Sequence, residues 1–129
     1  MGLRVPGGGD SADEFIPPGG ITLPEHLTPD NLSLLGHLFG NALTPLHTAA
    51  QILERGGDIG VELGNAVRSA RKEITRTVDF LLERYGSDID AISGLRQFLI
   101  QFRQDVKDFR WQQAVDDYRA ASARFHFSC

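Results

Sequence analysis

The chain has 129 residues, a formal net charge of −4, and ordinary shares of apolar and charged side chains, which together indicate one globular domain with a tail. Its only cysteine, Cys129, excludes an internal disulfide framework and a cysteine-based zinc site. No apolar run approaches the ~20 residues that a membrane-spanning helix needs, and no signal peptide is evident at the start. We therefore expect a cytoplasmic protein, in a reducing intracellular compartment and without a membrane span.

Residues 1–27 are interrupted by Gly and Pro, so we predict an extended or flexible N-terminal arm rather than a helix or a central strand. The stretch FIPPGGITLP, residues 15–24, carries large apolar side chains. Three alternatives follow for the arm: a disordered leader, packing on the chain's own body, or docking on a neighbouring subunit or partner. Residues 1–30, with one basic and five acidic residues, account for the net charge, because residues 31–129 hold 12 basic and 12 acidic residues.

Residues 28–129 form a predicted helical domain, because their apolar residues recur at steps of three and four. The sequence Thr28-Pro29-Asp30 has residue types favoured at a helix start, and the first helix is predicted over 29–54, kinked or split at Pro45. A second helix is predicted over 59–85, ended by Gly86. The fold class is therefore all-α: a small helical bundle or helical hairpin.

The third predicted segment, 88–126, carries two apolar stripes whose phase changes near Arg110, so we predict a bend there. A continuous helix over this range would be about 58 Å long. Because that length does not fit a compact body of about 100 residues, the segment is predicted either to break or to project and pack on another chain.

Aromatic residues are concentrated in the last third of the chain. Each aromatic side chain removes roughly 150–250 Å² of surface when it is buried, and the two earlier helices offer mostly Leu, Val and Ala as cover. We predict a protein interface here, used for self-association as a dimer or higher oligomer, or for docking on another helical protein. The alternative is a bundle that folds the segment onto its own core. The predicted interface residues are Phe98, Phe102, Phe109, Trp111, Tyr118, Phe125 and Phe127.

Basic residues follow one face of the second predicted helix, with Arg68, Lys72 and Arg76 in successive turns and Arg71 beside them. This face lies opposite the apolar stripe, and its basic-then-acidic order opposes the helix macrodipole. A second basic stripe, beside the aromatic residues, comprises Arg96, Arg103, Lys107 and Arg110. Three interpretations stay open: charges that order helix–helix contacts, charges that follow the phosphates of duplex RNA, or a solvated face.

The stretch SARKEITRTVDFLLER, residues 69–84, resembles the long second helix of the nodavirus RNA-silencing suppressors. Those viral proteins are small, dimeric and all-helical; they lie along double-stranded RNA and are not enzymes. The resemblance implies that Arg71 and Arg76 contact phosphates, whereas Ser69 stands where a basic residue would be expected. It covers about 16 residues, and the matching positions are Ala70, Arg71, Arg76, Val78, Leu81, Leu82, Glu83 and Arg84.

Patterns typical of enzymes, metals or cofactors are absent from the sequence. The four histidines are scattered, and no nucleophile motif is present. The carboxylates at 105, 108, 116 and 117 have the chemistry to hold a cation, but we predict that they form a solvated face. We therefore predict a non-enzymatic assembly or adaptor protein, or a structural subunit, without a cofactor. The alternative is a double-stranded RNA binder that uses Arg68, Arg71, Lys72 and Arg76.

Overall fold

The computed structural model describes residue 17 and residues 21–127, and all the regular structure in this part of the chain is helical. The all-α prediction is therefore confirmed. The elements, in chain order, are the short 3₁₀ helix η2 (Pro29–Asn31) and the α-helices α2 (Ser33–Glu54), α3 (Gly60–Arg84), α4 (Gly86–Asp90), α5 (Leu95–Lys107) and α6 (Trp111–Phe125).

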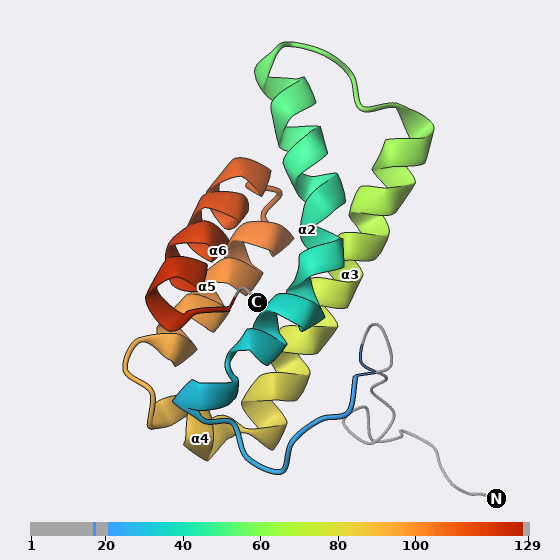
Figure 1. Cartoon of the computed structure of the whole chain (residues 1–129). Helices are drawn as coiled ribbons and strands as arrows, with labels where there is room; N and C mark the ends of the chain where they lie inside the picture. Colours follow the sequence, from blue (N-terminus) through green and yellow to red (C-terminus); the bar gives the residue numbers. More distant parts are fainter. Residues whose placement is uncertain (1–16, 18–20, 128–129) are drawn as a thin grey trace, which may run out of the picture.

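Four of these helices form an antiparallel bundle of two hairpins (Figure 1). The hairpin of α5 and α6 lies against the hairpin of α2 and α3, with α6 on α2 and α5 on α3. The two hairpins differ in length, because α2 and α3 have 22 and 25 residues whereas α5 and α6 have 13 and 15. The ends of α2 and α3 near residues 54 and 60 therefore extend beyond the shorter hairpin (Figure 1).

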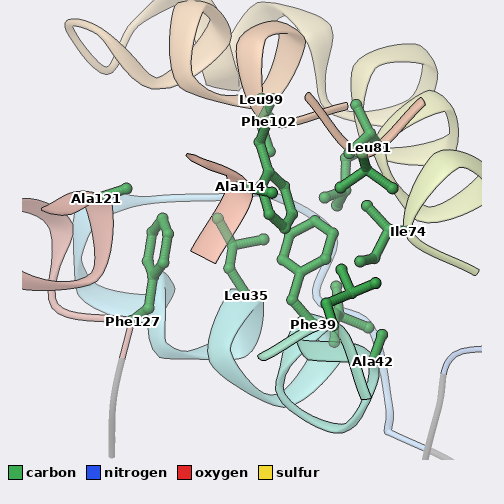
Figure 2. Packing of buried hydrophobic residues seen from close by; sticks show 14 of the residues in the cluster. Leu35, Phe39, Ala42, Ile74, Leu81, Leu99, Phe102, Ala114, Ala121 and Phe127 are labelled. Carbon is green, nitrogen blue, oxygen red and sulfur yellow. The ribbon is translucent and has the colours of Figure 1, made fainter. Parts of the chain in front are cut away.

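The core lies where the two hairpins meet (Figure 2). Phe39 of α2 and Phe102 of α5 are fully buried, and their rings meet edge to face with centroids 5.3 Å apart. Ile74 and Leu81 of α3 lie beside these two rings, and both are fully buried. Edge-to-face contacts of this kind stabilise aromatic pairs beyond the area that they bury.

The first helix begins as predicted but is not split. The Thr28 N–H donates to the Asn31 side-chain oxygen at 2.8 Å, and Pro29 opens η2 where its missing N–H is tolerated. Pro45 lies inside one continuous helix, α2. The carbonyl that loses its partner N–H there belongs to Asn41, an exposed residue, so solvent can hydrogen-bond to it.

The second helix, α3, ends within one residue of the predicted bounds at each end. Its predicted apolar stripe faces the core, because Val67, Ala70, Ile74, Val78 and Leu81 are all buried. The period of 3.6 residues therefore predicted both the helix and its buried face.

The third segment is bent where predicted but is broken into three helices. A gap at residues 108–110 separates α5 from α6, which confirms the bend near Arg110. The predicted start at residue 88 is wrong, because a five-residue helix, α4, ends at Asp90 before α5 begins. Gly94 adopts the left-handed conformation with φ 85°, which only glycine adopts without strain, and it turns the chain into α5.

Part of the predicted arm packs on the chain's own body. Leu27 is buried, and Ile21 and Leu23 pack against the core. The Tyr85 hydroxyl donates to the Pro24 carbonyl at 2.6 Å, and the Leu27 N–H donates to Asp88 at 2.9 Å. The remainder of the predicted arm, residues 1–16 and 18–20, lies outside the described residues.

The C-terminal aromatic residues fold back onto the bundle. Phe127 is fully buried and lies against α2 near Leu35 (Figure 2). Its carbonyl oxygen stands only 2.2 Å from the place where a Cβ on Gly36 would lie, so the close approach requires glycine in α2.

This packing overturns the argument that the aromatic residues need another molecule to cover them. Phe102, Trp111, Phe125 and Phe127 are buried within one chain. Phe98 and Tyr118 are partly buried and pack against the same core. The expectation is wrong because α5 and α6 form a hairpin that closes on both α2 and α3. Only Phe109, with 64% of its surface exposed, differs from this pattern.

Candidate functional site

The turn between α5 and α6 places Phe109 in an unfavourable conformation on the surface. The Phe109 N–H donates to the Val106 carbonyl at 3.2 Å, and the Arg110 N–H donates to the Asp105 carbonyl at 2.9 Å. These two bonds define a Schellman cap, whose left-handed position usually holds glycine. Phe109 occupies that position with φ 66°. A side chain there costs roughly 1 kcal/mol, so local stability does not explain this residue.

The ring of Phe109 is held in place by two neighbours. The Arg71 guanidinium of α3 lies 4.6 Å from the ring centroid, and the same group donates to the Lys107 carbonyl at 2.9 Å. Trp111 meets the ring edge to face, with centroids 5.4 Å apart. One face of the ring is therefore covered by Arg71 and one edge by Trp111, while most of the side chain stays in contact with solvent.

An open groove of about 560 Å³ lies beside Phe109, between the end of α2 and the start of α6. Its apolar lining comprises Ala50, Leu53, Phe109 and Trp111, and Leu53 is half exposed. The groove's lining residues come from the last turns of α2, from the turn that holds Phe109 and from the start of α6. Figure 1 shows that α2 continues beyond the shorter hairpin at this end of the bundle. We refer to the groove together with Arg71, Lys107 and the turn as the Phe109 corner.

Arg110 anchors the corner to a buried carboxylate. Its guanidinium donates two hydrogen bonds to one oxygen of Asp105, at 2.8 and 3.0 Å, and another to Asp108 at 3.1 Å. Asp105 is buried, so the predicted solvated face is wrong for this residue. Burial alone would raise the pKa of Asp105, but hydrogen bonds from Asp117, Arg110 and Gln101, with the charge of Arg110, lower the pKa overall.

A second carboxyl group lies beside Asp105 on α6. Burial raises the pKa of Asp117, and its hydrogen bond with Asp105 and the charge of that group raise it further. The buried Oδ2 atoms of both residues otherwise lack hydrogen-bond partners in the described part of the chain. When Asp117 is protonated, its hydroxyl can donate to Asp105, which would satisfy both carboxyl groups and link α6 to α5.

Charge is divided across the Phe109 corner. Arg110 is already paired with two carboxylates, so the uncompensated positive charge near Phe109 comes from Arg71 and Lys107. The opposite wall of the groove carries Glu54 and Asp116, neither of which pairs with a basic residue among those described. The corner thus combines an exposed aromatic group with a basic side and an apolar groove with an acidic wall.

The predicted basic face of α3 is solvent-exposed along most of its length. Arg68, Lys72 and Arg76 are exposed, and none forms an ion pair with a carboxylate in the described residues. Arg71 differs, because it is half-buried, donates a hydrogen bond to the Lys107 carbonyl and lies over the Phe109 ring. The predicted set of four therefore divides into three available cations and one that stabilises the α3–α5 contact.

The second basic stripe is mostly occupied within the chain. Arg96 pairs with Asp90, Arg103 pairs with Asp79, and Arg110 pairs with Asp105 and Asp108. The hydrogen bond to Arg96 lowers the pKa of Asp90. Lys107 alone among the four is exposed and makes no ion pair with a described residue.

Three comparisons with known proteins give no relative from which a site could be transferred. No protein-family model, no curated protein and no solved structure matches the chain. The described residues contain no group of three or more His, Cys, Asp or Glu that could hold a metal ion. Among the described helices, none has the length and apolar character needed to cross a membrane. The resemblance of residues 69–84 to the nodavirus suppressors stays a prediction.

Phe109 was predicted from the sequence as an interface residue, whereas the groove beside it was not predicted. Leu53, Glu54 and Asp116 were not among the predicted site residues, because no periodic pattern relates the end of one helix to the start of another 57 residues later. One signal was available: Phe109 ends the first apolar stripe of the third segment, where the phase changes. A large apolar residue at such a break has no assured place in the core.

Proposed function

We propose that the chain is a non-enzymatic assembly or adaptor module that binds protein through the Phe109 corner. The observation that carries the proposal is Phe109 itself, which takes a left-handed backbone position and leaves most of an aromatic side chain in solvent. Unfavourable local choices of this kind are expected where a surface is used for function.

The composition of the corner is that of a protein-binding surface. Protein interfaces combine an aromatic or apolar centre with a polar and charged rim, and a few aromatic and Arg residues supply most of the binding energy. Phe109, Trp111 and Leu53 form such a centre, and Arg71 and Glu54 belong to such a rim. Because Arg71 and Trp111 already fix the ring, little conformational freedom is lost on binding.

Selection of peptides from a phage-displayed random library on the immobilised protein tests this proposal. We expect selected peptides to lose at least tenfold in affinity for F109G and to retain affinity for I100S. Ile100 is an exposed apolar residue of α5 that does not line the groove, so I100S is the matched control. Peptides that bind F109G as tightly as the wild type, or the absence of any selected peptide, would contradict the proposal.

The basic face of α3 supports a second candidate, binding of double-stranded RNA. The supporting observation is that Arg68, Lys72 and Arg76 are exposed in successive turns without carboxylate partners in the described residues. Regularly spaced cations on a helix can bind phosphates without reading bases. The resemblance of residues 69–84 to the viral suppressors implies the same ligand. Arg71 is an exception within this face, because its guanidinium donates to the Lys107 carbonyl.

A gel-shift experiment with a duplex RNA of about 20 base pairs at two salt concentrations tests this candidate. We expect binding that weakens steeply with salt. R76E and K72E should each weaken binding, whereas R119E should leave it unchanged, because Arg119 is an exposed cation of α6 outside the α3 face. The absence of a shift at low salt, or equal losses for all three variants, would contradict RNA binding by this face.

A further inference from the structure

We infer that the occupant of the groove at the Phe109 corner is Phe109 of a second copy of this chain. This inference rests on the proposed function, because it takes the corner to be a protein-binding surface and then identifies the partner. It depends on which kind of side chain the groove can bind and on where the described part of the chain exposes such a side chain.

The groove selects an apolar group flanked by positive charge. Its apolar lining is Ala50, Leu53, Trp111 and the chain's own Phe109, and its wall carries the carboxylates of Glu54 and Asp116. Arg110 also lines the groove, but its charge is paired with Asp105 and Asp108. It also lies at the C-terminal end of α2, where the helix macrodipole is negative. A partner with acidic groups beside its apolar anchor would be repelled by this wall.

The chain itself presents a group of this description. Phe109 is the most exposed aromatic residue of those described, and it projects from the same corner. Its immediate surroundings are basic, with Arg71 over the ring and Lys107 at the end of α5, and neither forms an ion pair with a described carboxylate. Asp108 also lies at this turn, and it shares the single positive charge of Arg110 with the buried Asp105.

A twofold arrangement uses both features at once. In a two-fold dimer the same surface serves both copies, so each Phe109 can enter the groove of its partner. The basic side around each ring then meets the acidic wall of the other copy, and both pairs of charges are compensated. A partner with charges of one sign would compensate either the basic side or the acidic wall of the corner, but not both.

Analytical ultracentrifugation of the full chain between about 1 and 100 µM tests the inference. We expect a concentration-dependent monomer–dimer equilibrium that weakens with added salt. F109G should weaken the dimer at least tenfold, while I100S leaves it unchanged. Circular dichroism and thermal unfolding confirm that each variant is folded, and F109G removes backbone strain rather than adding it.

Charge reversal distinguishes a specific contact between two copies of the chain from non-specific association. K107E and D116K should each weaken the dimer about fivefold, because each places like charges across the interface. The double variant K107E/D116K reverses both sides and should recover most of the wild-type affinity. Such recovery indicates that the two positions meet across the dimer, since Lys107 and Asp116 form no ion pair with each other within the described part of one chain.

Two results would overturn the inference. One is a wild-type chain that stays monomeric at 100 µM, and the other is an F109G dimer as tight as the wild type. If the chain is monomeric but peptides still bind the corner in a manner that depends on Phe109, the proposed function stands and the second copy is wrong. If neither peptides nor a second copy depend on Phe109, the proposed function fails too.

Discussion

The ends of α5 and α6 adopt the same backbone conformation, yet their aromatic residues lie in opposite environments. After α5, Phe109 itself takes the left-handed position, with φ 66°, and stays exposed. After α6, the exposed His126 takes that position, with φ 60°, and the next residue, Phe127, is buried against α2. An aromatic residue in the left-handed position of the cap therefore stays on the surface, whereas one in the next position reaches the core.

This comparison shows that a segment rich in aromatic residues does not necessarily form an interface. Five of the eight phenylalanines lie between residues 98 and 127, but the hairpin of α5 and α6 shelters all of these except Phe109. A single exposed ring in a strained position is therefore more informative about binding than the density of aromatic residues in the segment.

Gly36→Ala should produce the largest loss of stability among the changes considered, about 2 kcal/mol. The added Cβ would lie 2.2 Å from the Phe127 carbonyl oxygen, so the buried C-terminal turn has to move. The free energy of unfolding in urea measures the effect. Gly40→Ala is the control in the same helix, because nothing lies within 4 Å of its added Cβ, and it should stabilise by up to ~1 kcal/mol. Equal stabilities of the two variants would show that Phe127 is not docked on α2.

Arg110→Ala should cost about 2 kcal/mol, because it leaves the buried Asp105 carboxylate without its cation. The Asp105 side chain is 1% exposed and the Arg110 side chain 48%, so the loss should be smaller than for a fully buried pair. Arg96→Ala removes the solvent-exposed pair with Asp90 and should lower stability much less than Arg110→Ala, because water screens exposed ion pairs.

The same pair has a defined pH dependence. Because the folded-state pKa of Asp105 is lowered, its stabilising contribution is present above the ordinary pKa of about 4 and is lost as the pH falls through the folded-state value. The difference in unfolding free energy between the wild type and Arg110→Ala should therefore shrink below about pH 4. A difference that is constant from pH 7 to pH 3 would contradict this account of Asp105.

Phe109→Gly should be more stable than Phe109→Ala by about 1 kcal/mol, because glycine adopts the left-handed conformation without strain. His126→Gly and His126→Ala should differ by a similar amount, since the backbone is the same at both positions. Thermal or urea unfolding of the four variants measures both differences. If alanine matched glycine at position 109 alone, the strain assigned to the Phe109 corner would be absent.

Sequence periodicity predicted the parts of the fold that depend on one helix at a time. The bounds and the buried face of α3 follow from its apolar spacing, and the bend near Arg110 follows from the change of phase. The start near Thr28 follows from the residue types favoured at helix caps.

Features that depend on two helices together could not be predicted in this way. Nothing in the spacing of Phe102 or Tyr118 shows that α5 and α6 close on α2 and α3 rather than on another chain. The groove lined by Leu53 and Trp111 likewise exists only because the two hairpins differ in length. Because glycine is absent from the turn at 108–110, residue type also gave no sign that Phe109 would cap a helix.

Asp117→Asn should have the smallest effect, about 1 kcal/mol or less of stabilisation at neutral pH. The folded-state pKa of Asp117 is raised, so its favourable contribution is present below the ordinary aspartate pKa and is lost as the pH rises through the folded-state value. The asparagine amide can donate to Asp105 at every pH, so the variant should not show this loss. Its advantage over the wild type should therefore grow from about pH 4 towards neutrality in urea unfolding. Asp58→Asn removes a charge from an exposed aspartate between α2 and α3 and provides the control, whereas Asp116 is unsuitable because its charge helps to raise the pKa of Asp117. A wild-type chain whose stability does not fall relative to Asp117→Asn over this range would show that no proton joins α5 to α6 beneath the Phe109 corner.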